Sequence, residues 1–179
     1  PFSHLASVYG SSLAVLWIDA HSDTSVPGDS YTGFHSMALA TLAGEGDAGV
    51  LAELPALIPP ANILQVGLRH WDGEGIAVKE RLGIQSVGWT DTPNDNRQVL
   101  EWIAGTGARQ LAVHINLDVI DRRDLTDSTG QATDGMRMSA LVSLVTGAAG
   151  VADIVGLSLA EHIPTELMRL SGLLRDLPL

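Results

Sequence analysis

Five short apolar segments alternate with longer segments of mixed polarity, and this alternation constrains the fold more than any other feature of the chain. The apolar segments cover residues 13–19, 63–68, 85–88, 111–118 and 153–159. Such runs are typical of parallel strands that are covered on both faces. Helices are predicted between and after them, over residues 35–42, 75–82, 94–103, 139–148 and 165–177. The alternation predicts an α/β fold, with helices on both faces of a mostly parallel sheet and a single domain over residues 1–179.

The composition argues against several classes of protein. The chain has 10 Lys and Arg against 21 Asp and Glu, so its formal net charge is −11. An acidic surface of this kind is unsuited to nucleic acid and to anionic membranes. No apolar run reaches the roughly 18 residues that a membrane-spanning helix needs. The chain has no cysteine, which excludes disulfides and zinc–thiolate sites and fits a reducing compartment, so we expect a cytoplasmic protein.

The first segment that indicates chemistry follows the strand predicted over residues 13–19. Asp19, His21 and Asp23 alternate there, and alternate residues of an extended chain point the same way. Parallel α/β folds place their sites at the carboxyl edge of the sheet, where these side chains would converge. Two carboxylates and an imidazole after so apolar a strand predict a metal site rather than a solvated turn.

A second polar cluster ends the strand predicted over residues 111–118. His114, Asn116 and Asp118 alternate there, and Asp121 follows. Oxygen ligands with one or two imidazoles favour Mn²⁺, Mg²⁺ or a similar divalent ion. Two such ions about 3.5–4 Å apart can bind and ionise one bridging water. His114 is expected to support the ligands from behind rather than to bind metal itself.

These motifs resemble those of the ureohydrolase family, the arginase and agmatinase group, over nearly the whole chain. Residues 19–23 match the family's D-A-H-x-D motif. Its S-x-D-x-D-x-x-D-P motif is matched at Asp118 and Asp121, and Glu161 precedes a proline as in its E-V-N-P segment. The resemblance implies a three-layer α/β/α sandwich with a mostly parallel sheet. It also implies hydrolysis of a guanidino or amidino compound by a metal-bridging hydroxide.

The resemblance implies a metal site that holds one or two Mn²⁺ ions. Its ligands would be Asp19, His21, Asp23 and Asp118, with Asn116 at the position of a further ligand. The family has an aspartate at that position, which bridges both ions, and a neutral amide cannot replace it. Losing one charge next to a divalent ion costs several kcal/mol even at an effective dielectric constant of about 20. We therefore expect weak occupancy and impaired activity.

The resemblance also implies residues that act on the substrate. His35 would shuttle protons, and Glu161 would hold the guanidinium by paired charged hydrogen bonds. Asp72, Ser25 and Thr32 would bind the far end of the substrate.

The family's first metal motif, G-G-D-H or G-G-D-C, does not occur in this chain. Because this motif is absent, we expect the opening strands of the family's sheet to be absent as well. An edge of the sheet would then be uncovered. We therefore expect the chain to form homo-oligomers or to pair with an upstream fragment.

Two other interpretations remain open at this point. The chain could be a catalytically silent ureohydrolase relative that serves as a binding or assembly subunit, which Asn116 favours. It could also be a deacetylase-type metal hydrolase, because that family has a related fold and similar clusters of Asp and His. The combination of residues 19–23 with Glu161 before Pro164 favours the ureohydrolase interpretation over the deacetylase one.

Overall fold

A computed structural model describes residues 1–69, 73–89, 95–126, 133–163 and 167–178 of the chain. Its strands are β1 (Leu13–Ile18), β2 (Ile63–Val66), β3 (Gln85–Val87), β4 (Gln110–Asn116) and β5 (Asp153–Ala160). Its α-helices are α1 (Phe2–Tyr9), α2 (Ala38–Leu42), α3 (Ala48–Glu53), α4 (Glu74–Leu82), α5 (Arg97–Thr106), α6 (Met138–Ala149) and α7 (Leu167–Asp176). The described residues also form the short 3-10 helices η1 (Gly10–Ser12), η2 (Phe34–Met37), η3 (Pro60–Asn62) and η4 (Leu117–Val119).

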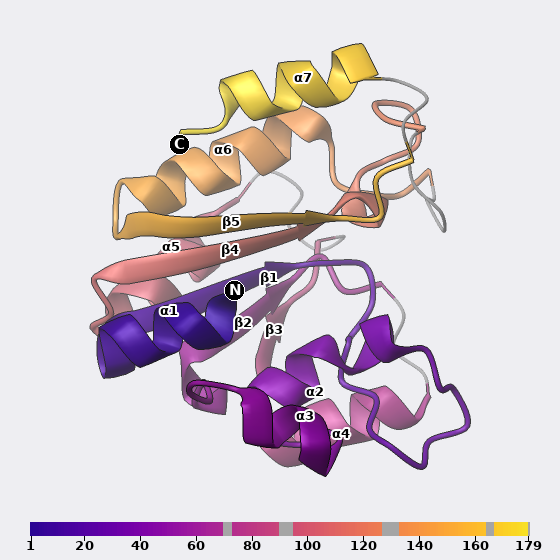
Figure 1. Ribbon diagram of the computed structural model, residues 1–179. Helices are drawn as coiled ribbons and strands as arrows, with labels where there is room; N and C mark the ends of the chain where they lie inside the picture. The colour runs from indigo at the N-terminus through magenta and orange to yellow at the C-terminus, as the bar shows by residue number, and fades with distance from the viewer. Residues whose placement is uncertain (70–72, 90–94, 127–132, 164–166, 179) are drawn as a thin grey trace.

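The five strands form one parallel sheet in the order β3-β2-β1-β4-β5 (Figure 1). The central strand β1 is buried along its whole length, whereas β5 lies at an edge and is only partly buried. A strand with neighbours on both sides and helices on both faces needs apolar residues at every position, as β1 has. The predicted α/β fold with helices flanking a parallel sheet is confirmed.

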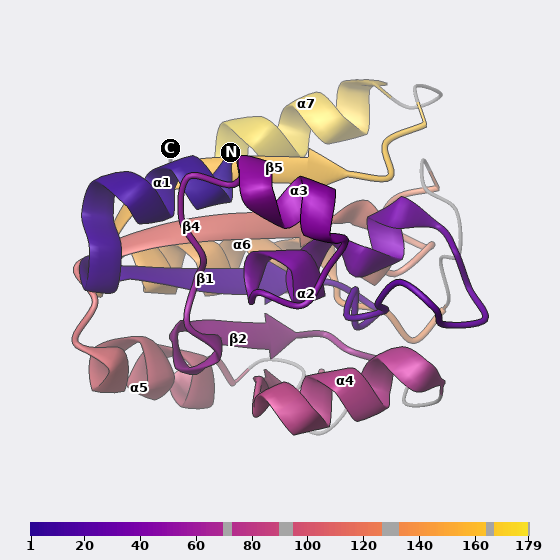
Figure 2. The ribbon, with the colours of Figure 1, turned by 60° about the horizontal axis from the view of Figure 1, so that its bottom comes forward.

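Two hydrophobic cores lie on opposite faces of the sheet, and β1 contributes to both by alternation. Leu13, Val15 and Trp17 point into the core under α1 and α2, while Leu16 and Ile18 point into the core under α5, α6 and α7. Figure 2 shows α1, α2 and α3 in front of the sheet and α6 behind it. In the described part of the chain no helix has the length and apolar character needed to cross a membrane.

Helix α3 was not predicted from the sequence. Its six residues are too few to show a helical period, although its start carries a recognisable cap. The carboxylate of Asp47 accepts hydrogen bonds from the backbone N–H groups of Gly49 and Val50, at 2.9 and 3.2 Å. Such a cap satisfies donors that the first turn of a helix leaves without partners.

Candidate metal centre

The candidate site residues lie where three neighbouring strands end. Asp19 follows β1, Asp118 lies in η4 directly after β4, and Glu161 follows β5. Because β1, β4 and β5 are adjacent and parallel, these three ends meet at one edge of the sheet. The register fixes this arrangement, since Trp17 is paired with His114, and His114 with Ser158.

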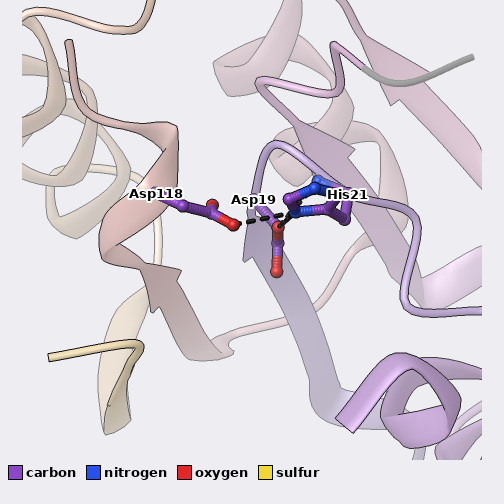
Figure 3. Close-up of side chains that lie close together, drawn as sticks. All are labelled: Asp19, His21 and Asp118. Atoms are coloured by element: carbon purple, nitrogen blue, oxygen red, sulfur yellow. Dashed lines mark hydrogen bonds and ion pairs between the residues drawn. The ribbon is translucent and has the colours of Figure 1, made fainter. Parts of the chain in front are cut away.

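One group of side chains joins the two motifs found in the sequence. The Nδ1 atom of His21 lies 2.8 Å from Oδ2 of Asp118 and 3.7 Å from Oδ1 of Asp19 (Figure 3). Each of the three residues offers one ligand atom, and these atoms lie within 4.8 Å of one another. The backbone N–H of His21 also donates to Oδ1 of Asp19 at 2.7 Å, which holds this carboxylate in place.

The ionisable side chains at this site change one another's pKa. The hydrogen bond to Asp118, and then that to Asp19, raises the pKa of His21 from 6.5 to about 10. Burial, followed by the charge of Asp19, raises the pKa of Asp23 well above its ordinary value. Without a metal the cluster therefore retains protons that a divalent cation would displace.

A second group of side chains shares Asp19 with the first. Asp19, Asp23 and His114 each offer a ligand atom, and these atoms lie within 4.8 Å of one another. The Nε2 atom of His114 is 3.9 Å from Oδ2 of Asp19. Burial lowers the pKa of His114 to about 4, so its imidazole is neutral near pH 7. His114 is buried and lies within reach of two carboxylates, those of Asp19 and Asp23.

The two groups fit a divalent cation. The Oδ2 atom of Asp19 is fully buried and has no hydrogen-bond partner among the described residues. A buried carboxylate oxygen without a partner is costly, and a cation removes that cost. Carboxylate oxygens and imidazole nitrogens suit Mn²⁺ and similar ions, and no thiolate is present in the chain to favour a softer one.

Asn116 lies at the site, but its oxygen is already engaged. Its Oδ1 accepts a hydrogen bond from the backbone N–H of Asp118 at 3.2 Å, which caps η4. Asn116 is buried and borders the same cavity as Asp118. As it stands, this side chain positions Asp118 and offers no charge to a cation.

A cavity of about 510 Å³ opens next to the first group. Of the residues predicted from the sequence it is lined by His21, Asp23, Ser25, His35, Asn116, Asp118 and Glu161. Asp19 is buried beneath these residues, and Thr32 is exposed outside the lining. Asp72 lies outside the described residues. The cavity is thus lined by four of the five predicted metal-site residues, together with His35, the predicted proton shuttle, and Glu161, the predicted partner of the guanidinium.

The rim of the cavity includes Tyr31, which the sequence analysis missed. Its hydroxyl lies 3.1 Å from Nε2 of His35, and the two rings meet edge to face at 5.6 Å between centroids. Both side chains are exposed. No pattern in the sequence marks this pair, because an isolated tyrosine four residues before a histidine has no special spacing in a loop.

Two of the predicted site residues have a strained backbone. Asp23 has φ 50° and Glu161 has φ 61°, and they are the two non-glycine residues with positive φ in the described chain. Residues other than glycine rarely adopt this conformation, and those that do are concentrated at functional sites. Both residues line the cavity beside the first group.

Arg69 is a second residue that the sequence analysis missed. Its guanidinium donates to the backbone oxygens of Asp118 and Val119 at 2.7 and 3.0 Å, and its backbone N–H donates to the oxygen of Ala20 at 3.0 Å. Gly67, with φ 93°, allows the backbone before Arg69 to pack against Val119. A Cβ atom at this position would lie 2.4 Å from the side chain of Val119. The segment after β2 therefore ties the two metal motifs together.

Comparison with known proteins agrees with this geometry. The model of the Arginase family matches residues 2–167. An arginase from Staphylococcus aureus (strain COL) is 34% identical over 134 residues, which are 71% of this chain and 43% of that protein. The chain thus spans less than half the length of that relative.

Solved structures of arginases share the fold at low sequence identity. The arginase of Entamoeba histolytica, in complex with L-ornithine, has a TM-score of 0.86 at 20% identity, covering 98% of this chain and 62% of that one. The arginase of Bacillus cereus has a TM-score of 0.83 at 20% identity, covering 98% and 64%. The family model and the aligned relative, rather than the shared fold, favour the ureohydrolase interpretation over the deacetylase-type one. The family match and the aligned relative show that this chain belongs to the Arginase family.

Proposed function

We propose that this chain carries an amidinohydrolase site, which hydrolyses a guanidino or amidino compound with the help of Mn²⁺. The observation that carries the proposal is the convergence of Asp19, His21 and Asp118 beside a cavity lined by His35 and Glu161. Family membership supports the same reaction class. Each part of that reaction has a candidate group at this cavity.

Asp19, His21 and Asp118 would hold a Mn²⁺ ion, with Asp23 and Asn116 as the other candidate ligands. When bound, such an ion supplies a Lewis acid that ionises water near neutral pH. The pKa of His21, raised to about 10, means that this imidazole must lose its proton before it can bind metal. The ligands therefore favour occupancy at alkaline pH.

Glu161 and His35 would act on the substrate from the cavity side. A carboxylate can accept two parallel hydrogen bonds from a guanidinium, which both binds the group and orients it. His35 would move a proton through Nε2, the atom that lies 3.1 Å from the hydroxyl of Tyr31. Ser25 in the lining, together with Thr32 and Asp72, would contact the far end of the substrate, and the L-ornithine bound by the Entamoeba histolytica arginase supports an amino acid there.

We further propose that activity is impaired and that metal occupancy is weak. Asn116 adds no charge, and its oxygen accepts the N–H of Asp118. The same observation favours the second candidate function, a catalytically silent relative that acts as a binding or assembly subunit. Mn²⁺-dependent release of urea or a related product separates these two functions.

The test uses the purified chain with Mn²⁺ and measures hydrolysis of arginine, agmatine and related guanidino compounds. We expect slow turnover that chelator abolishes. Glu161→Gln should raise KM, because an amide cannot accept two hydrogen bonds as a carboxylate does. His35→Ala should mainly lower kcat, by about 10²–10⁴-fold.

Glu53→Gln is the matched control, because Glu53 is an exposed carboxylate on α3, remote from the cavity lining. Hydrolysis that is equal in all three variants and the parent would show that the site is misplaced. A complete lack of hydrolysis with Mn²⁺ bound would favour the silent relative.

We also propose that the chain associates through the edge strand β5. Its residues are only partly buried, whereas every residue of β1 is buried. An uncovered edge strand offers backbone groups that a further strand can pair with. The added strand would come from a second copy of the chain or from an upstream fragment. Light scattering at high concentration should show self-association, and a single monomeric species would contradict it.

A further inference from the structure

His114 is held in a fixed orientation at the inner wall of the metal centre. Its ring stacks on Trp17, with 3.8 Å between centroids and 23° between planes. Its Nδ1 atom lies 2.7 Å from the hydroxyl of Ser158 on the neighbouring strand. The stacking fixes the plane of the ring and the hydrogen bond fixes its rotation, so Nε2 faces Asp19.

The two carboxylate oxygens of Asp19 face different partners. Oδ1 accepts the backbone N–H of His21 and lies 3.7 Å from that imidazole. Oδ2 lies 3.9 Å from Nε2 of His114 and has no hydrogen-bond partner among the described residues. Asp19 therefore presents one oxygen to each of the two groups.

The distance between His114 and Asp19 suits a shared cation better than a hydrogen bond. At 3.9 Å it exceeds the separation of a hydrogen-bonded nitrogen and oxygen. Two ligand atoms that each lie about 2.1 Å from one metal ion can be up to about 4.2 Å apart. The fully buried and unpartnered Oδ2 supplies the electrostatic reason for a cation between them.

We propose that His114 is a metal ligand, and that with Asp19 and Asp23 it forms a second cation site next to that of Asp19, His21 and Asp118. The inference deepens the proposed function and rests on it, because both sites share Asp19. The ion is a divalent one that accepts both imidazole and carboxylate, such as Mn²⁺, Co²⁺ or Zn²⁺.

The hydrogen bond at Nδ1 is the arrangement that protein sites use to orient a metal-binding histidine. Such a histidine usually has its other ring nitrogen hydrogen-bonded, which fixes the tautomer and the direction of the lone pair. Ser158 provides that contact from β5. The ureohydrolase motif has serine where this chain has His114, so this ligand belongs to the chain itself and comes with its own support.

The experiment counts Mn²⁺ ions by electron paramagnetic resonance of the free ion, on the parent chain and on His114→Phe. Phenylalanine keeps a ring against Trp17 and removes the ligand atom. We expect two ions bound to the parent and one bound to the variant. The variant's affinity for the second ion should be at least about tenfold weaker than that of the parent. His21→Gln should lower the affinity for the other ion, the one held by Asp19, His21 and Asp118. His4→Gln is the matched control, because His4 is exposed on α1.

His114→Gln provides a second variant if phenylalanine disturbs folding. A measurement without any substitution follows the imidazole nitrogens by NMR while Zn²⁺ is added, and the resonance of Nε2 of His114 should shift whereas that of His4 stays. If both His114 variants bind Mn²⁺ as the His4 control does, or if the His114 resonance stays, the inference is wrong and the proposed function stands. If the parent binds no Mn²⁺, both are wrong.

Discussion

The site has two regions that differ in how they are held, the strand-end cluster of Asp19, His114 and Asp118 and the rim formed by Tyr31 and His35. The cluster is buried, with Asp19 fully buried, whereas the side chain of Tyr31 is 54% exposed. In the cluster, a backbone N–H holds Asp19, the ring of Trp17 and the hydroxyl of Ser158 hold His114, and the imidazole of His21 contacts Asp118. In the rim, a hydroxyl–imidazole contact and an edge-to-face ring contact join two exposed side chains.

This difference indicates that the two regions respond to different forces. Charges in the cluster are removed from water, so their mutual repulsion is strong and a bound cation has a large effect. Charges and hydroxyls at the rim remain in water, where single contacts contribute little to stability. Substitutions in the cluster should therefore change metal binding and folding together, and substitutions at the rim should change neither.

The largest effect is expected for Asp19→Asn, because both groups share Asp19. The variant should lose Mn²⁺ binding at both groups, with affinity at least about 100-fold weaker, since each ion loses a charged ligand. In chelator it should be more stable than the parent, because one of several crowded carboxylates has gone. Titration calorimetry and melting curves measure the two effects.

Asp153→Asn is the control for this variant, because Asp153 is an exposed carboxylate at the start of β5. Tight Mn²⁺ binding by Asp19→Asn would show that the cluster is not the metal centre.

A smaller effect of opposite direction is expected for Asn116→Asp. The change is nearly isosteric and adds a carboxylate to the cavity that Asp118 also lines. In chelator the added charge should lower the melting temperature through repulsion. With millimolar Mn²⁺ the variant should gain more stability than the parent, by RT ln(1 + [L]/Kd). An unchanged Mn²⁺-dependent shift would show that residue 116 is not at the centre.

The pH dependence of the metal-free chain tests the contacts between His21 and the carboxylates of Asp118 and Asp19. The pKa of His21 is raised in the folded state, from 6.5 to about 10. A raised pKa contributes stability that is fully present below pH 6.5 and is lost as the pH rises toward about 10. In chelator the melting temperature should therefore fall over this range, and His21→Gln should flatten the fall.

With Mn²⁺ the trend should reverse over the same range, because His21 must lose its proton to bind metal. A metal-free melting temperature that rises with pH in this range would contradict the ion pair between His21 and Asp118.

The smallest effect is expected at the rim, for Tyr31→Phe. The change removes the hydroxyl that lies 3.1 Å from His35 and leaves the ring in place. The free energy of unfolding should change by less than about 0.5 kcal/mol, as is usual for exposed positions. Mn²⁺ affinity should equal that of the parent. Denaturant unfolding and Mn²⁺ titration check both, and a loss of metal binding would show that rim and cluster are coupled.

Much of the fold could be predicted from the sequence, because each buried strand is a local run of apolar residues. Strand β1 was evident from its unbroken apolar run, and the polar residues after it from their alternation. Helix α3 was missed because a six-residue helix has no measurable period. Asp72 falls outside the described residues, so its predicted contact with the substrate stays a prediction.

Part of the site could also be predicted. Alternation predicted a common direction for Asp19, His21 and Asp118. The structure does bring their ligand atoms within 4.8 Å of one another, although Asp118 lies in the 3-10 helix η4 rather than in the predicted strand. Tyr31 and Arg69 had no such pattern, because each contacts the site across a loop or between strands. A contact between distant segments depends on how the strands are paired, which a local pattern does not contain.

The sequence by itself determined which residues end the strands and which face of the sheet they share, because side-chain direction alternates with a period of two along any strand. The tertiary structure decided which side chains meet. The pairing of Trp17 with His114, and of His114 with Ser158, sets that imidazole opposite Asp19. The physical reason is that parallel strands are joined by long connections, so their relative register follows from packing of the whole domain.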